Sequence, residues 1–478
     1  MFYLVGTLLL TVAGLMLIPL AVDLAHGHED WWAFAVGSAV SFILGAILAR
    51  WCRCELQSGL DLRQAFLLTP VSWLSVAAVG TIPFYFSEFG IVSGSLTNAF
   101  FESMSGLTTT GSTVITKLHE APPGLLIWRA QLQWIGGIGI IAVAIAVLPA
   151  LGIGGMQLFR TESSDRSEKA MPRVRQIAKG IGLVYVSLTI AAGLSYWAAG
   201  MTLFEATAHA LTTISTGGYS TSDNSLGNWN AGIQWISALF MLSGGVPFVL
   251  YVRFLAGERH ALWDHQVKTL LGFLAVVIAG LTAWLALSGQ YALPDAARFA
   301  TFNTISIVTT TGYATTDFQL WGNIAIGLFF GLMFVGGCTG STAGGIKIFR
   351  FEVMASLLRV HFLRLLYPNG VFPRTYAGKR LSDDVIGSVV VFFAIFFTCY
   401  SALTIALMAM NLDFATSASG AVTAIANVGP GIGEIIGPAG NFSTLPDPAK
   451  WLLSFAMLLG RLELFTVLVL FMPRFWKG

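Results

Sequence analysis

The sequence predicts an all-α integral membrane protein, because its charge is low, its apolar content is high and its apolar stretches are long. Asp, Glu, Lys and Arg make up only 10 % of the 478 residues, against roughly 25 % in an average soluble domain. Residues of the set AVILMFWYC make up 55 %. A soluble fold could not cover so much apolar surface with so few charges. A disordered chain is also excluded, because disorder requires low hydrophobicity.

Ten apolar stretches are long enough to cross a membrane, which takes about 20 mostly apolar residues. The first stretch lacks the basic leader and the small-residue cleavage site of a signal peptide, so we expect it to be retained as a helix. The ten predicted spans cover residues 2–24, 32–51, 66–87, 130–156, 178–199, 231–255, 268–288, 320–346, 385–411 and 451–473.

The basic residues gather in the loops that follow the even-numbered spans. Lys and Arg concentrate on the cytoplasmic side of membrane proteins, so these loops and both termini are predicted to be cytoplasmic. Acidic residues such as Glu102 and Glu434 fall in the outer loops. There they would attract cations, or simply balance the basic charge on the cytoplasmic side. The net charge of +2 gives no sign of nucleic-acid binding, and no nucleic-acid partner is expected. The basic residues outside the pattern are Lys117, Arg129, Arg298, Lys450 and Arg461.

The outer loops after spans three, five, seven and nine share a polar stretch that runs into glycine. Aligned on Gly111, Gly217, Gly312 and Gly429, they recur at intervals of roughly 100 residues, which indicates a long internal repeat. Two spans separate successive loops, so all four units have the same orientation, unlike inverted repeats. We therefore predict four parallel span–pore helix–filter loop–span repeats around a pseudo-fourfold pore, plus an extra N-terminal helix pair. The expected units are a two-span extension (1–60), repeat 1 (61–160), repeat 2 (161–260), repeat 3 with a gate loop (261–380) and repeat 4 (381–478).

Each loop follows a segment that is too short to span but long enough for a helix that enters halfway (98–107, 203–213, 295–308 and 414–425). A helix aimed inward points its negative end at the axis, and four glycine-containing strands can supply rings of carbonyl oxygens for an alkali cation. A turn or a helix-packing feature is the alternative reading of such loops. The predicted filter residues are Thr109, Thr110, Gly111, Ser215, Thr216, Gly217, Thr310, Thr311, Gly312, Asn427, Val428 and Gly429.

The four Thr/Ser-rich glycine loops, each flanked by two spans, resemble those of the Trk/Ktr/HKT superfamily of potassium transporters. The fourth loop, Asn-Val-Gly-Pro-Gly-Ile-Gly at 427–433, and the extra pair of spans are similar to the TrkH-like bacterial branch. The resemblance implies potassium uptake across the bacterial inner membrane, with K⁺ at the filter residues as the transported ion and no organic cofactor. It also implies a homodimer that assembles with a cytosolic nucleotide-binding ring of the TrkA type.

The eighth predicted span contains Val-Gly-Gly-Cys-Thr-Gly-Ser-Thr-Ala-Gly-Gly-Ile-Lys at 335–347. A regular helix tolerates these glycines poorly, at about 1 kcal/mol each. The resemblance implies an intramembrane loop that closes the pore beneath the filter, whereas close helix packing is the alternative. A phosphate-binding loop is excluded by Ile346, which separates Gly345 from Lys347. The expected gate residues are Gly336, Gly337, Thr339, Gly340, Ser341, Thr342, Gly344 and Gly345, with Arg461 beside them.

Arg461 lies within the tenth predicted span, where a charge is costly and should face the pore or a partner. The resemblance implies that it lies near the gate loop, as an electrostatic barrier and a latch on the carbonyl groups of the loop. A structural pair buried between helices is the alternative. Glu463 is a possible partner, although a residue two positions further along a helix does not lie on the same face.

Two other functions stay open at this point. A coupled secondary transporter of another small solute would need a substrate-sized polar pocket near the membrane midplane, whereas the glycine loops lie in the outer half. An enzyme would need a nucleophile and base, or metal ligands, at membrane depth. No His, Asp and Glu cluster of that kind occurs in the predicted spans, so we do not expect an enzyme. His209, in the second short segment, is expected to be a packed core histidine.

Overall fold

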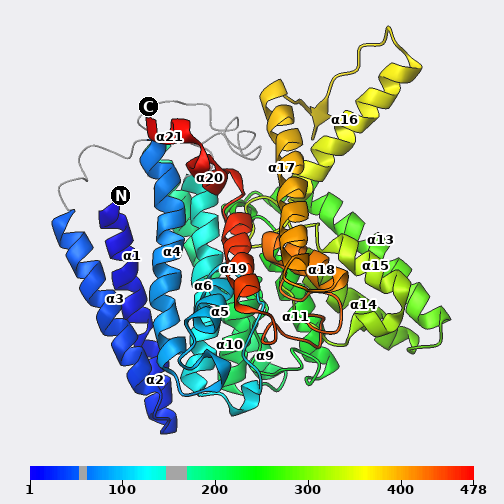
Figure 1. Cartoon of the computed structure of the whole chain (residues 1–478). Helices are drawn as coiled ribbons and strands as arrows, with labels where there is room; N and C mark the ends of the chain where they lie inside the picture. The colour runs from blue at the N-terminus through cyan, green and yellow to red at the C-terminus, as the bar shows by residue number, and fades with distance from the viewer. Residues whose placement is uncertain (53–61, 147–169, 478) are drawn as a thin grey trace.

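The computed structural model describes residues 1–52, 62–146 and 170–477, and it is mostly helical (Figure 1). Long helices stand side by side, and α16 projects away from them next to a short hairpin. In the described part of the chain, strands are limited to β1 (Thr375–Tyr376) and β2 (Lys379–Arg380), which pair antiparallel. The all-α fold class is confirmed. The predicted unit boundaries at residues 60 and 160, and the end of the fourth predicted span, lie outside the described residues.

Long helices and short helices are interspersed along the chain. The α-helices are α1 (Phe2–Leu15), α2 (Leu17–His26), α3 (Trp31–Trp51), α4 (Leu62–Phe86), α5 (Leu96–Leu107), α6 (Pro123–Ala146), α9 (Ala170–Ala198), α10 (Leu203–Ile214), α11 (Ala231–Gly244), α12 (Phe248–Leu255), α13 (His265–Leu287), α14 (Leu293–Val308), α15 (Asn323–Leu332), α16 (Ile348–Leu366), α17 (Asp383–Met408), α18 (Phe414–Ala426), α19 (Asp447–Arg461), α20 (Phe465–Leu468) and α21 (Pro473–Lys477). Single 3₁₀ turns lie at Gly90–Val92, Leu118–Glu120, Ala261–Trp263, Phe318–Trp321 and Val469–Phe471.

Seven stretches of helix in the described residues are long and apolar enough to cross a membrane, or up to nine if two bent pairs each count as one span. One bent pair is α11 with α12, which meet at 90° across a Gly-Val-Pro break at 245–247. The other is α19 with the segment Phe465–Phe471, which meet at 109°. There Glu463 and Leu464 adopt positive φ angles of 62° and 53°. A right-handed α-helix requires negative φ angles, so the helix ends at this point.

The eighth predicted span is not one continuous helix, as its glycines indicated. Only α15, over Asn323–Leu332, is helical, and the chain then runs without regular helix until α16 begins at Ile348. The reason is the run of glycines at 336–345, two of which, Gly340 and Gly345, adopt the left-handed φ angles of 85° and 66°. Irregular backbone at this depth is tolerated only where protein or water satisfies its polar groups.

The bundle exposes many apolar side chains, and its interior buries polar residues as well as apolar ones. On α3, Phe42, Ile43 and Leu44 are exposed to the surroundings. By contrast, the hydroxyl residues Thr110 and Ser306 at the centre of the bundle are completely buried. An apolar lateral surface suits contact with lipid, whereas buried hydroxyls and backbone groups must be satisfied inside the protein.

The four short segments expected to enter the membrane halfway are helices in the structure. They are α5, α10, α14 and α18, and each begins and ends within a few residues of its predicted limits. Side chains cap three of their N-termini: Ser95 before α5, Thr202 before α10 and Asp413 before α18 each accept a hydrogen bond from a backbone N–H in the first turn. The fourth, α14, instead has a proline in its first turn.

The N-terminal helices α1 and α3 cross at glycines. A Cβ atom on Gly6 would lie 2.7 Å from the backbone nitrogen of Ala49 and 2.9 Å from the carbonyl oxygen of Gly45. Small residues at such crossings let two backbones approach closely in a membrane. The end of α2 is joined to the rest of the bundle by Asp23, whose carboxylate accepts a hydrogen bond from the backbone N–H of Gly124, 2.6 Å away.

We predict that Gly6→Leu will separate α1 from α3 and lower the thermal unfolding temperature of the purified protein. Overpacking of this kind costs about 1–3 kcal/mol. The matched control is Gly14→Leu in the same helix, because nothing lies within 4 Å of a Cβ atom at Gly14. Equal unfolding temperatures for the two variants would contradict the close crossing.

Candidate functional site

The four short helices end in the same backbone motif. After each helix, one residue adopts the left-handed conformation: Thr109 (φ 52°), Thr216 (φ 50°), Thr310 (φ 56°) and Asn427 (φ 55°). The next residue donates its N–H to the carbonyl five positions back, as in Thr110 to Ser105, Gly217 to Thr212, Thr311 to Ser306 and Val428 to Thr423, at 2.8–3.0 Å. This is the Schellman motif, in which glycine normally holds the left-handed position. Three threonines there cost about 1–3 kcal/mol each and persist only where the surroundings fix them.

The shared motif sets the register of the four glycine loops (107–113, 213–220, 308–315 and 426–433), and it corrects the sequence alignment in the second loop. The residue that follows the motif is a glycine with positive φ in every loop: Gly111 (85°), Gly218 (79°), Gly312 (80°) and Gly429 (104°). Gly218 is therefore the equivalent of Gly111, and the alignment on Gly217 is wrong by one residue. Gly217 is the equivalent of Thr110, Thr311 and Val428. Ser215 is the equivalent of Thr108. Two adjacent glycines left the register ambiguous in the sequence.

The four glycine loops form a closed ring of backbone contacts. A Cβ atom on each of these glycines would come too close to the carbonyl oxygen of the residue before the equivalent glycine in the next loop. The fourth such contact returns to the first loop, so the order around the ring is that of the sequence. The contacts join Gly111 to the oxygen of Gly217, Gly218 to that of Thr311, Gly312 to that of Val428 and Gly429 to that of Thr110. Glycine is required here for space as well as for φ.

A cavity of about 110 Å³ opens on the outer side of this ring and touches all four of its glycines. Its wall is mostly backbone and small side chains, including Ala314 and Pro430, and Asp223 is the acidic residue of its lining. The loops themselves contribute carbonyl and hydroxyl oxygens to this region and no carboxylate. Neutral oxygens of this kind are the ligands that suit a dehydrated monovalent cation.

On the inner side of the ring, buried hydroxyl groups are linked to one another. The hydroxyls of Thr108 and Thr110 lie 2.8 Å apart, and those of Thr309 and Thr311 lie 2.8 Å apart. The amide of Asn427 donates to the hydroxyl of Thr110 over 2.9 Å, which joins the fourth loop to the first. These contacts satisfy polar groups that would otherwise be costly to bury.

The glycine-rich stretch (335–347) lies against the inner ends of the short helices. Thr342 donates its hydroxyl to the carbonyls of Ile214, 3.1 Å away, and Gly244, 3.0 Å away. The backbone N–H of Gly344 donates to the hydroxyl of Thr310 over 2.7 Å, and a Cβ atom on Gly344 would strike the carbonyl of Ala426. The stretch therefore contacts the ends of α10, α14 and α18, on the side of the ring opposite the outer cavity.

Arg461 joins the glycine-rich stretch to α6. The side chain is 3 % exposed, and its guanidinium donates to the carbonyl of Thr342 over 2.8 Å and to that of Gly136 over 3.1 Å. Its expected alternative partner, Glu463, instead pairs with Arg350 at the start of α16. A small cavity of about 20 Å³ adjoins Arg461 and the stretch, enough for about one water molecule.

A recurrent pair of residues after each glycine loop was not recognised as a repeat from the sequence. The pairs are Gly136-Gly137, Gly244-Gly245, Gly336-Gly337 and Gly460-Arg461. In three of them the first glycine packs against the carbonyl oxygen at the end of its own short helix, namely that of Leu107, Ile214 or Ile425. Arg461 therefore stands where the other three units have glycine. The Gly-Gly dipeptide was the available signal.

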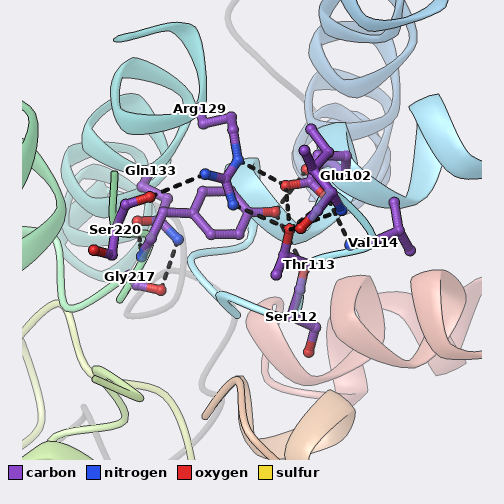
Figure 2. Close-up of polar contacts among 10 residues, drawn as sticks. Glu102, Ser112, Thr113, Val114, Arg129, Gln133, Gly217 and Ser220 are labelled. Atoms are coloured by element: carbon purple, nitrogen blue, oxygen red, sulfur yellow. Dashed lines mark hydrogen bonds and ion pairs between the residues drawn. The ribbon is translucent and has the colours of Figure 1, made fainter. Parts of the chain in front are cut away.

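Two charged residues that were predicted on the outer side of the membrane are buried in the core. Glu102 was expected in an outer loop, but it lies inside α5 and is 0 % exposed. Arg129 of α6 is 1 % exposed and binds the Glu102 carboxylate over 2.8 Å (Figure 2). Arg350 and Lys347 are also buried, so Arg461 is not alone among basic residues in the interior. His209 is fully buried, as expected of a packed core histidine.

A bundle of apolar helices with four half-length helices whose ends meet in a ring of carbonyl groups defines a membrane transport protein. The chain belongs to the TrkH family of cation transport proteins, which it matches over residues 32–477. It is 46 % identical to the potassium uptake protein TrkI of Halomonas elongata over 99 % of this chain and 96 % of that protein. It is 36 % identical to TrkH of Escherichia coli K12 over 99 % and 98 % of the two chains. The crystal structure of the potassium transporter TrkH from Vibrio parahaemolyticus is also similar, with a TM-score of 0.90, 34 % identity and coverage of 99 % and 98 %.

Proposed function

We propose that this protein takes up potassium across the inner membrane of a bacterium, through a selectivity filter made of the four glycine loops. The observation that carries the proposal is the closed ring, in which four backbones meet through equivalent glycines and expose neutral oxygens to a shared cavity. Its relatives are named as potassium uptake proteins of the Trk system. They are transporters, and the chain is grouped with them rather than with enzymes.

The filter would work by replacing the water around K⁺ with protein oxygens. The carbonyl groups that line the ring come from residues whose backbone is fixed by the Schellman motifs, so they need not reorganise when an ion arrives. The short helices α5, α10, α14 and α18 all direct their C-terminal ends at this ring, and the partial negative charge there favours a cation. The residues of the proposed filter are Thr109, Thr110, Gly111, Thr216, Gly217, Gly218, Thr310, Thr311, Gly312, Asn427, Val428 and Gly429.

The glycine-rich stretch would close the path beneath the filter. It occupies the inner ends of three short helices, and the positive charge of Arg461 beside it would repel a passing cation. The hydrogen bond from Arg461 to the carbonyl of Thr342 would also hold the stretch in its closed position. Opening would then require that this bond break and that the stretch move away from the axis.

The proposal for regulation and assembly is supported by the relatives' names, which place those proteins in a Trk system. We propose that both termini lie in the cytoplasm, that two copies form a dimer and that a TrkA-type nucleotide-binding ring docks on the cytoplasmic side. The division into an N-terminal pair of spans and four repeats is part of the same proposal. It is supported by the equivalent Schellman motifs and by the recurrent pairs that begin at Gly136, Gly244, Gly336 and Gly460.

A coupled transporter of another small solute is the alternative. The two cavities along the proposed path, about 110 Å³ and about 20 Å³, are smaller than the roughly 300–1,000 Å³ of typical small-molecule sites. The small size of both cavities, and the uncharged oxygens that the glycine loops expose to the larger one, favour a bare ion.

Gly312→Ser is expected to distort the third loop, because the new side chain would meet the carbonyl of Val428 and the ring of Pro430. We expect the preference for K⁺ over Na⁺ to fall by about tenfold, which corresponds to about 1.4 kcal/mol. The measurement is competition between rubidium and sodium for uptake into proteoliposomes. Gly280→Ser in α13 is the control, since a Cβ atom there has nothing within 4 Å. Unchanged selectivity in Gly312→Ser would remove this loop from the filter.

We expect Arg461→Ala to raise potassium flux by on the order of tenfold in proteoliposomes that contain this protein without a partner. That increase corresponds to a barrier for potassium passage that is lower by about 1.4 kcal/mol. Arg461→Gln separates the two proposed roles, because glutamine can still donate to the carbonyl of Thr342 but carries no charge. High flux in both variants supports the barrier, and high flux in the alanine variant alone supports the latch. The control is Arg474→Ala, which alters an exposed arginine of α21. Loss of folding without a rise in flux would instead assign Arg461 a structural role.

A further inference from the structure

A buried polar cluster lies against the first two glycine loops (Figure 2), and its members Thr113, Arg129 and Ser220 also line part of the outer cavity. Its centre is the ion pair between Glu102 of α5 and Arg129 of α6. Besides Arg129, the Glu102 carboxylate accepts hydrogen bonds from the Thr113 hydroxyl, at 2.9 and 3.1 Å, and from the Val114 backbone N–H, at 2.9 Å. Both acceptor oxygens are therefore engaged by the segment that leaves the first loop.

Arg129 connects the first loop to the second. One nitrogen of its guanidinium donates to the hydroxyl of Thr113 over 3.0 Å, and another donates to the carbonyl of Ser220 over 3.1 Å. The guanidinium carbon also lies 4.1 Å from the centre of the Tyr219 ring. A planar arginine can make these contacts at once because its donors lie in a fixed fork, which a lysine lacks.

Gln133, one turn further along α6, reaches the ring itself. Its side-chain amide donates to the carbonyl of Gly217 over 2.6 Å and accepts from the backbone N–H of Tyr219 over 3.0 Å. The carbonyl of Gly217 is the one that faces Gly111 in the ring. The hydroxyl of Tyr219 in turn donates to the carbonyl of Ser112, 3.2 Å away. The cluster therefore fixes backbone atoms on both sides of the contact between the first and second loops.

In three of the four short helices, the side chain at the same position binds the segment that leaves the loop, and only the first of these side chains is an acid. Glu102, His209 and Asn303 each lie three residues before the carbonyl that accepts the Schellman hydrogen bond. His209 lies 3.0 Å from the Ser220 hydroxyl, and Asn303 donates to the Thr315 hydroxyl over 2.9 Å. The fourth helix has Gly420 at this position, and its neighbour Ser419 accepts from the N–H of Ile432 over 2.8 Å.

We propose that the Glu102–Arg129 pair, with Thr113 between them, is a positioning device that sets the spacing of the first two loops and thereby the discrimination between potassium and sodium. The inference rests on the proposed function of the ring as a cation filter. Burying an ion pair is not an economical way to stabilise a fold, because apolar side chains of similar volume do as well or better. A fork of charge-assisted hydrogen bonds is well suited to hold backbone oxygens in one place. None of the three side chains needs to touch the ion.

The test compares pairs of variants of the full-length protein in proteoliposomes of Escherichia coli lipids. Thr113→Val is nearly isosteric but removes the shared hydroxyl, whereas Thr113→Ser keeps it. Arg129→Lys keeps the charge without the fork, and Glu102→Gln keeps the shape without the charge. The matched controls are Arg374→Lys and Asp383→Asn, which alter an exposed ion pair of 2.8 Å away from the ring.

The measured quantities are the potassium-to-sodium uptake ratio, the KM for potassium, the maximal rate and the thermal unfolding temperature. We expect at least a threefold lower ratio and a higher KM for Thr113→Val, Arg129→Lys and Glu102→Gln, a smaller change for Thr113→Ser and none for the controls. A purely structural role would lower the unfolding temperature and the maximal rate together and leave the ratio of the folded protein unchanged.

Two results overturn the proposal, and they are distinguishable. If the unaltered protein prefers potassium but folded Thr113→Val and Arg129→Lys keep the same ratio, the positioning role is wrong and the filter stands. If the unaltered protein moves cations without preference, the proposed filter itself is wrong, and this inference with it. Should the charged-residue variants fail to fold, the isosteric threonine variant decides the question alone.

Discussion

The structure depends on the way in which four short helices end. Each ends in a Schellman motif whose left-handed residue turns the chain sharply, so that the next carbonyl faces the backbone of the neighbouring loop. A threonine in that conformation is unfavourable by itself, so the surrounding helices must hold it. They do so with glycines: Gly136, Gly244 and Gly460 let the following helices lie directly against the ends of α5, α10 and α18. Backbone-to-backbone contact thus fixes the ring with few side chains involved.

The interior of the protein has a low dielectric constant, so a buried charged side chain needs a partner. Arg129 and Arg350 are each buried with a carboxylate partner, Glu102 and Glu463. Arg461 differs, because in the described part of the chain its hydrogen bonds go to the carbonyl oxygens of Thr342 and Gly136 and to no carboxylate. Its charge is therefore only partly compensated. Such an arrangement is unfavourable for stability alone, and its place beside the glycine-rich stretch, where the other units have glycine, is consistent with an electrostatic role.

The two faces of the ring have different chemistry. The outer cavity is lined mostly by glycine backbone and small residues. On the inner side, threonine hydroxyls form hydrogen bonds with one another and with the glycine-rich stretch. Thr310 connects the third loop to the glycine-rich stretch: it follows α14 in the left-handed conformation, and its hydroxyl accepts the N–H of Gly344.

The sequence by itself determined the fold class, the four short helices and the break in the eighth predicted span. These follow from local signals, namely hydrophobic length, glycine content and the polar stretch after each short helix. Only the tertiary structure decided that Gly218 rather than Gly217 belongs to the ring, that Glu102 lies in the core and that Glu463 pairs with Arg350 rather than with Arg461. The physical reason is that register, burial and ion pairing depend on contacts between different helices and loops, which come together only when the chain folds. Composition and spacing along one segment carry no information about those contacts.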